Sequence, residues 1–502
     1  MPINFIPNDP LAKNGPPMRR QNPHADRPTA SAGFTWVAHA SAAPFDVGTP
    51  DYLFWQSREA VLRAVANFET LTGKRIAQWA RSSNRKRLQV SPNAGTDLNA
   101  YYDGQGLRFF EYTAGGKTTF SGASTDVVAH ESGHALLDQM RPDLWDSSFT
   151  ETAAFHEAFG DCNALLTAFA DQTTRDLVRA SVRKANFVEA TAEDLSDGVR
   201  RALGAKHPAA QPRHALNNFR WALPSTLPSS GPPATLSSEI HSFSRIFSGC
   251  FYDTILNILT ARIGKATPTS AQLSQAVQTA GKLLIAAAAD APENARFFQS
   301  VGRTMILVDQ QQNAGANRMA IHDAFDRHGI ALGSAAMLAP VAALAGGRAK
   351  GARLPAAAVA DLRRRIGAAP GAQIHIRRTT ICGRPFLHAT HHRELPLEKL
   401  DRRLKGVIAM VPESTLLGGH DRSVAILGGL PEPTGSADEV NAFVRALLAA
   451  DRIAFETGEA RSGIPGRGRD RRMRLPTHTI RNLRGKRVLE RVRFACGGEY
   501  LG

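Results

Sequence analysis

Cysteine is scarce in this chain, which has four among its 502 residues. The four lie far apart, and no two of them form a C-x-x-C pair: Cys162, Cys250, Cys382 and Cys496. This pattern supports neither a disulfide scaffold nor a zinc site built from cysteines.

Long apolar runs are also missing. No stretch approaches the roughly 18 apolar residues that a membrane-spanning helix needs, so no transmembrane segment is predicted. Residues 1–28 are rich in Pro, Asn and Arg and lack the apolar core of a secretory signal. We therefore expect residues 1–35 to form an extended arm. We expect the protein to act in the cytoplasm or to be exported by a route that needs no N-terminal signal.

Acidic residues are under-represented in the last third of the chain. Residues 341–502 contain 29 Lys and Arg against 15 Asp and Glu, which accounts for +14 of the total net charge of +16. Such a segment would neutralise the phosphates of a nucleic acid or an anionic membrane surface, and the alternative is a solvated charged face. Few aromatic residues are interleaved with the basic ones, so stacking on single-stranded bases has little support.

A change in composition marks a boundary between two domains. Residues 332–355 are rich in Ala and Gly and are interpreted as a linker. Beyond it, apolar patterns predict strands at 373–377, 406–410 and 423–427 and a helix at 436–450. Residues 471–494 alternate basic and apolar residues around Gly485, a pattern that indicates a hairpin. Residues 356–502 are therefore predicted to form a small basic α+β domain, for which no family is recognised.

The most informative motif is His130-Glu131-Ser132-Gly133-His134, which has the form H-E-x-x-H. On a helix, two histidines four residues apart project from the same face. Their neutral ring nitrogens can then reach one tetrahedral Zn²⁺, while the glutamate between them is placed to hold an attacking water.

A second segment supplies a third ligand. Glu157 lies 23 residues after His134, and Asp161 lies four residues later on the same helical face. His130, His134 and Glu157 would leave one metal position open, as a catalytic zinc site requires. Asp161 is placed to accept a hydrogen bond from a ligating imidazole, which we expect to be that of His130.

Both motifs lie on predicted helices. Ser124-Thr125-Asp126 are good N-cap residues ahead of the first, and Pro142 ends its apolar pattern. Ser148 and Glu151 have the spacing of a capping box, which predicts the start of the second helix.

Together the two motifs resemble the zinc signature of the thermolysin-like metallopeptidases of the gluzincin group, and the likeness covers roughly residues 40–331. Upstream, Asn99-Ala100-Tyr101-Tyr102 resembles the family's Asn-Ala-aromatic-aromatic edge strand. Downstream, residues 241–249 and 321–325 resemble segments of its helical half. The resemblance implies an α+β, thermolysin-like zincin fold for residues 36–331, with a β-rich N-terminal lobe and a helical C-terminal lobe, followed by the small basic domain.

The resemblance also implies roles for individual residues. The zinc ion would lower the pKa of its bound water, and Glu131 would take the proton of that water and pass it to the leaving amine. Asn99 and Ala100 would hold the main chain of an extended peptide.

The sequence departs from the family at the positions that stabilise the oxyanion. Where the family has a Tyr, this chain has Trp145, whose indole N–H is a donor of different reach. No counterpart of the family's oxyanion histidine is found beyond the His241 segment, because the next histidine is His322. Arg220 and Arg245 are the candidates for a substitute donor, and Arg220 is assigned to substrate binding.

The sequence thus predicts a zinc-dependent endopeptidase that acts on peptide or protein substrates. One alternative is a catalytically weakened zincin that binds peptides. The other is a basic anchoring or nucleic-acid-binding protein whose N-terminal part is mostly scaffold. One Zn²⁺ is the expected cofactor. Asp126 matches a calcium position of the family, but its acidic partners near residues 168–180 are not recognisable, so the sequence does not support a Ca²⁺ site.

Overall fold

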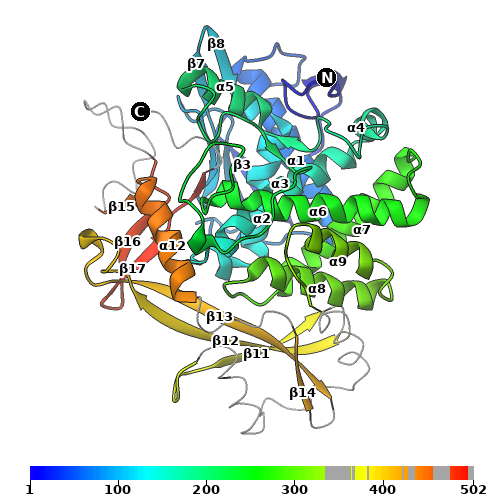
Figure 1. Ribbon diagram of the computed structural model, residues 1–502. Coiled ribbons are helices and arrows are strands. Elements are labelled where there is room, and N and C mark those ends of the chain that lie inside the picture. The colour runs from blue at the N-terminus through cyan, green and yellow to red at the C-terminus, as the bar shows by residue number, and fades with distance from the viewer. Residues whose placement is uncertain are drawn as a thin grey trace.

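The structure, a computed structural model, describes residues 1–333, 363, 368–381, 384–420, 423–427, 436–455 and 475–495. Within these ranges helices are combined with several β-sheets, so the general α+β class is confirmed (Figure 1). The predicted linker beyond residue 333, Cys382, Cys496 and the arginines of residues 461–474 lie outside the described residues. In the described part, no helix is both long and apolar enough to cross a bilayer.

One mixed sheet of five strands lies in the N-terminal half, and one of its edge strands comes from near the C-terminus. In spatial order it consists of β18 (Phe494–Ala495), β5 (Ala100–Tyr102), β6 (Gly106–Phe109), β4 (Arg87–Ser91) and β3 (Gly33–Trp36). The strands β3, β4 and β6 are parallel, whereas β5 is antiparallel to β6 and β18 is antiparallel to β5. Without β18, the strand β5 would therefore be the edge of this sheet.

The first 35 residues are fastened to this lobe. β1 (Ile3–Phe5) pairs antiparallel with β2 (Arg19–Gln21), and the side chains of Ile3 and Phe5 are fully buried. Two further two-stranded ladders are formed by β7 (Glu111–Ala114) with β8 (Lys117–Phe120) and by β9 (Ala190–Thr191) with β10 (Arg213–His214). The predicted extended arm thus contains a short ladder whose first strand is buried.

Helices make up much of the rest of residues 1–333. They are α1 (Pro50–Thr72), α2 (Thr125–Met140), α3 (Thr150–Ala170), α4 (Gln172–Val178), α5 (Glu193–Leu203), α6 (Ile240–Ile263), α7 (Ser270–Asp290), α8 (Phe297–Gln312) and α9 (Arg318–Arg327). Short 3-10 helices lie at Ser121–Ala123, Pro142–Leu144 and Pro224–Thr226, and a further one lies at Arg402–Leu404 in the second sheet region. The helix α3 lies at the centre and contacts α1, α2, α6, α7 and α8 (Figure 1). Its side chains are buried almost along its whole length, so it can carry a site that is shielded from water.

The predicted helix starts are only partly right. α2 begins directly after Ser124 and ends two residues before Pro142, as the sequence predicts. The capping box predicted for α3 is wrong, because the N-cap is Phe149 and no side chain caps the helix. Glu151 instead accepts hydrogen bonds from the backbone N–H of Phe298 and from the indole of Trp221. This carboxylate fastens α3 to α8 and to a loop rather than to its own helix end.

Two glycines let α2 and α3 approach closely. A Cβ atom added to Gly133 would lie 2.8 Å from the Cα atom of Gly160. A Cβ atom added to Gly160 would lie 2.6 Å from Cε1 of the His130 ring. Larger residues at either position would force the helices apart, so these glycines fix the distance between the two motif-bearing helices.

The C-terminal domain is built on a second sheet. Its strands are β11 (His375–Ile381), β12 (Arg384–Pro396), β13 (Val407–His420), β17 (Lys486–Arg491), β16 (His478–Leu483) and β15 (Ile453–Ala454) in spatial order, with β14 (Ser423–Leu427) paired to β13. The helix α12 (Ser436–Ala449) packs on it, and β16 and β17 form the predicted hairpin around Gly485. Phe149 and Ala153 of the first domain share one apolar core with residues of this sheet and of α12. The basic domain is therefore docked against α3.

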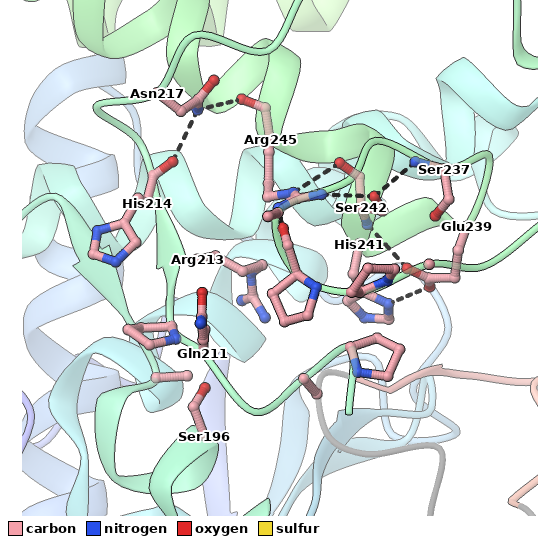
Figure 2. A pocket seen from close by; sticks show the side chains of 18 of the residues that line it. Ser196, Gln211, Arg213, His214, Asn217, Ser237, Glu239, His241, Ser242 and Arg245 are labelled. Carbon is pink, nitrogen blue, oxygen red and sulfur yellow. Dashed lines mark hydrogen bonds and ion pairs between the residues drawn. The ribbon is translucent and has the colours of Figure 1, made fainter. Parts of the chain in front are cut away.

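A cavity of about 330 Å³ lies between α5, the segment 208–219 and the start of α6 (Figure 2). Leu195 and Val199 of α5 and Phe219 contribute apolar side chains to its wall. Arg213 and His241 line it as well, and both also contact the residues of the two sequence motifs. The cavity therefore lies next to the predicted metal site.

The interface between the two domains contains a carboxyl group that titrates near neutrality. Glu293 is buried, and its burial together with the nearby Asp143 raises its pKa to about 8. Because the folded pKa lies above the unfolded value, the stability that the protonated group contributes is present at acid pH and is lost as the pH rises from about 4.5 to 8. We expect the melting temperature of a Glu293→Gln variant to fall less than that of the wild type as the pH rises from 5 to 8.5, because the amide has no proton to lose. The free energies of unfolding of the two proteins should diverge by at most about 1.4 kcal/mol per pH unit. Melting temperatures of both proteins across this pH range would measure the divergence.

Candidate metal centre

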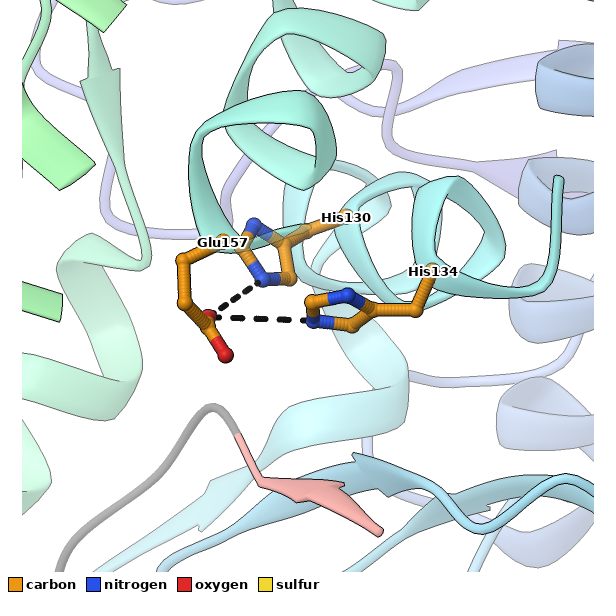
Figure 3. A group of neighbouring side chains, drawn as sticks. All are labelled: His130, His134 and Glu157. Atoms are coloured by element: carbon orange, nitrogen blue, oxygen red, sulfur yellow. Dashed lines mark ion pairs between the residues drawn. The ribbon is translucent and has the colours of Figure 1, made fainter. Parts of the chain in front are cut away.

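Three side chains of the two sequence motifs converge in the structure. His130 and His134 project from one face of α2, and Glu157 projects toward them from α3 (Figure 3). Oε2 of Glu157 lies 3.4 Å from Nε2 of His130 and 3.7 Å from Nε2 of His134. One ligand atom from each of the three residues lies within 4.8 Å of the others, and all three side chains are fully buried. The structure thus brings together the three predicted ligands in a geometry that can hold one metal ion.

The chemistry of the donor set fits a zinc ion. Both ring nitrogens of His134 are buried, and neither makes a hydrogen bond to the protein. Burial lowers the pKa of this imidazole to about 3, so the ring is neutral and keeps a lone pair for a metal. Two imidazoles and one carboxylate are a common ligand set of catalytic zinc. A metal ion would satisfy the buried polar atoms that the protein itself leaves without a partner.

Asp161 holds the His130 ring as the sequence predicts. Its Oδ1 accepts a hydrogen bond from Nδ1 of His130 over 2.9 Å, which directs Nε2 toward the other ligands. Arg213 forms an ion pair with Asp161 at 2.8 Å, and the hydroxyl of Ser248 donates to it over 3.2 Å. Burial works to raise the pKa of Asp161, but Arg213 and His130 outweigh it and hold the pKa below its usual range. The carboxylate therefore stays ionised beside the imidazole.

Arg213 and Ser248 were not predicted as site residues. They lie in β10 and in the third turn of α6, far from the H-E-x-x-H motif in the sequence. No spacing rule relates them to the motif, so only the tertiary structure reveals their contact with Asp161.

A third histidine also reaches the centre. Nε2 of His241, in the first turn of α6, lies 3.2 Å from Oε2 of Glu157, and its Nδ1 lies 2.7 Å from Oε1 of Glu239 (Figure 2). Burial works to lower the pKa of His241, but Glu157 and Glu239 outweigh it and raise the pKa well above its usual value. His241 therefore lies at the edge of the site between two carboxylates. The family's oxyanion histidine was expected only beyond the His241 segment, so His241 itself was not predicted as a donor.

Two predicted donors do not point into the centre. The indole N–H of Trp145 donates to the backbone carbonyl of Arg491 over 3.0 Å, so it is not available to a substrate in this arrangement. Arg220 is exposed, and its guanidinium donates to the carbonyl of Arg327. Arg245 lines the neighbouring cavity, where its guanidinium donates to the carbonyl of Thr235. The oxyanion role predicted for Trp145 and the substrate-binding role predicted for Arg220 have no support in this geometry.

The remaining predicted site residues lie on α2 and beside it. Glu131 follows His130 on the helix and is fully buried. Asn99 and Ala100 lie at the start of β5 and are also buried. Asp126, the candidate calcium residue, is buried near Asp9, and its carboxylate accepts a hydrogen bond from the N–H of Ala192.

No protein-family model matches the sequence, and a search of curated proteins found no match. The chemistry of the centre is therefore inferred from its own residues.

Proposed function

We propose that this protein is a zinc-dependent endopeptidase similar to the thermolysin-like gluzincins. The observation that carries the proposal is the buried cluster of His130, His134 and Glu157, with Glu131 on the same helix. If these side chains only stabilised the fold, burying two neutral imidazoles and a carboxylate would contribute little stability. A metal ion, in contrast, would bind all three of them.

Zinc bound here would polarise the scissile carbonyl and increase the acidity of the attacking water. Glu131 would accept the proton of that water and return it to the leaving amine. His241, which lies between Glu157 and Glu239, would donate to the oxygen on which negative charge develops. Asp161 and Arg213 would hold His130 in the tautomer that presents Nε2 to the metal.

An extended substrate would pair with β5 and place a side chain in the adjacent cavity. In the structure β18 pairs with β5, and with β18 displaced the main chain of β5 would offer the hydrogen-bonding groups of a sheet edge, as expected for Asn99 and Ala100. The cavity of about 330 Å³ has room for one large side chain, and its apolar wall favours an aliphatic or aromatic one.

His241 weighs against the alternative of a weakened, peptide-binding zincin. That alternative was motivated by a missing oxyanion histidine, and we propose His241, which lies beside Glu157, as a substitute donor. For the basic domain no observation favours an anionic partner over a solvated surface. Arg481 is paired with Glu490, and Lys486 is paired with Glu394.

Removal of the metal tests the proposal. We expect the zinc-loaded protein to cleave an unstructured protein such as casein, to lose this activity after dialysis against a chelator, and to recover it when one equivalent of zinc is returned. Cleavage fragments would be detected by mass spectrometry. Activity that survives complete zinc removal would contradict a metallopeptidase.

A further inference from the structure

The strand β18 occupies the free edge of the sheet beside the metal centre. Phe494 is paired with Tyr102 and Ala495 with Tyr101, in antiparallel register. Figure 3 shows this strand, in red, passing the three ligands next to the blue strands of the sheet. A segment from near the C-terminus therefore takes the place on β5 that an extended peptide would need.

The side chain of Phe494 packs on His134, one of the three proposed ligands. Its ring stacks on His134, with ring centres 4.7 Å apart and an angle of 14° between the planes. It also stacks on His156 at 4.1 Å and meets the edge of Trp145 at 5.3 Å. Phe494 is fully buried, as are His134 and His156. One aromatic side chain thus closes this side of the centre to solvent.

Backbone contacts anchor the segment on the loop after α2. The indole of Trp145 donates to the carbonyl of Arg491, and Nε of Arg491 donates back to the carbonyl of Trp145, both over 3.0 Å. The N–H of Arg491 donates to the carboxylate of Asp146. Between His241, Arg491 and Ala495 a cavity of only about 30 Å³ remains.

We propose that residues 494–495 are a built-in occupant of the peptide-binding edge and keep the metal centre latent until the segment is displaced. The proposal rests on the proposed function, in that β5 is the strand on which a substrate would pair. The occupant is a defined part of this chain, and its pairing imitates that of an extended peptide.

The β18 segment can be released from β5 while the rest of the C-terminal domain stays folded. The core of the C-terminal domain is formed by residues such as Val407, Phe443 and Leu489, and Phe494 is not part of it. Phe494 belongs instead to the core that contains His-bearing α2 and α3. Only Val492 and Arg493 connect β17 to β18. Release would therefore open the centre while the second sheet stays folded.

The β18 segment is held by contacts that a competing peptide can replace. Phe494 packs on His134 and His156, and the guanidinium of Arg491 lies over its ring at 4.1 Å. The pairing with β5 involves only Phe494 and Ala495 on the side of β18.

Two variants of β18 and one control test the proposal. Phe494→Ala removes the stacking, and Ala495→Pro removes a backbone donor with little change in the apolar core. Leu483→Ala, at an exposed position of the β16–β17 hairpin, controls for substitutions in the same domain. Each zinc-loaded full-length protein would be assayed with a fluorescence-quenched peptide and with a peptide hydroxamate that chelates zinc. Hydrogen exchange of residues 100–102 would be measured with and without zinc.

We expect both β18 variants to cleave the peptide and to bind the hydroxamate at least ten times better than the wild type, with faster exchange in β5. Leu483→Ala should behave as the wild type. If hydroxamate binding and exchange in β5 are unchanged in a folded β18 variant, the segment is a structural strand and the proposal is wrong. If hydroxamate binding and exchange both increase but no variant cleaves the peptide, the occlusion stands and the proposed hydrolysis fails.

Discussion

A Glu131→Gln variant is expected to keep one zinc per chain and to lose peptide cleavage by about 10²- to 10⁴-fold. The amide has the size of the carboxylate but cannot accept a proton from the attacking water. The substitution leaves the three proposed metal ligands, His130, His134 and Glu157, unchanged. The comparison is made as kcat/KM on a short peptide, with zinc content measured on the same samples.

The matched control is Ser132→Ala, the next residue on α2. Its hydroxyl donates to the carbonyl of Val128 within the helix, and it takes no part in the cluster. The pair is best compared in the Phe494→Ala background as well as in the wild type, so that the docked β18 segment does not mask activity. Cleavage by Glu131→Gln within a factor of two of Ser132→Ala would exclude Glu131 as the base.

A Gly160→Ala variant is expected to lose zinc binding although no ligand is changed. The new Cβ atom would lie 2.6 Å from Cε1, 2.7 Å from Nδ1 and 2.8 Å from Nε2 of the His130 ring. Asp161, the next residue on α3, holds Nδ1 of the ring, so relief of the clash would shift the ring out of the ligand position or separate the two helices. We expect the zinc affinity to fall by more than the roughly 10- to 100-fold typical of a lost supporting hydrogen bond. Competition with a chromophoric chelator measures this affinity.

Gly281→Ala separates this effect from ordinary overpacking. Its new Cβ atom would lie 2.8 Å from a methyl group of Leu166 and 3.1 Å from one of Leu71, in the contact of α7 with α3 and α1. Overpacking of this kind costs about 1–3 kcal/mol of stability in either variant. Only Gly160→Ala should lose zinc, and a Gly160→Ala protein with the zinc affinity of the wild type would refute the close approach of α3 to His130.

The parts of the site that the sequence predicts are those set by local helix geometry. His130, His134 and the pair Glu157 and Asp161 have spacings that one or two turns of helix convert directly into a shared face. His241 and Arg213 were missed because their contacts with the cluster depend on how α6 and β10 pack on α3.

The oxyanion role of Trp145 was predicted from its sequence position alone, and position alone does not show which group its N–H contacts. Its place after the second zinc histidine matches the family's donor, but its N–H is taken by a carbonyl from near the C-terminus. The pairing of β18 with β5 is of the same kind, because two short segments from distant parts of the chain leave no local pattern that relates them.

In the second domain the hairpin was predictable and the sheet order was not. Gly485 adopts a φ of 83°, which glycine tolerates in a tight turn between strands of alternating pattern. The parallel pairing of β13 with β17 joins strands that are far apart in the sequence. Neither strand carries a signal that selects its neighbour.

The central claim is that His130, His134 and Glu157 hold one zinc ion. X-ray absorption spectroscopy at the zinc edge, on purified protein whose metal content has been measured, tests this claim most directly. We expect one zinc per chain, with two imidazole nitrogens at about 2.0–2.1 Å, carboxylate oxygen and no sulfur. A Glu157→Ala protein measured under the same conditions should bind zinc far more weakly. Zinc with sulfur ligands, or stoichiometric zinc that the Glu157→Ala protein retains with unchanged affinity, would contradict the metal centre.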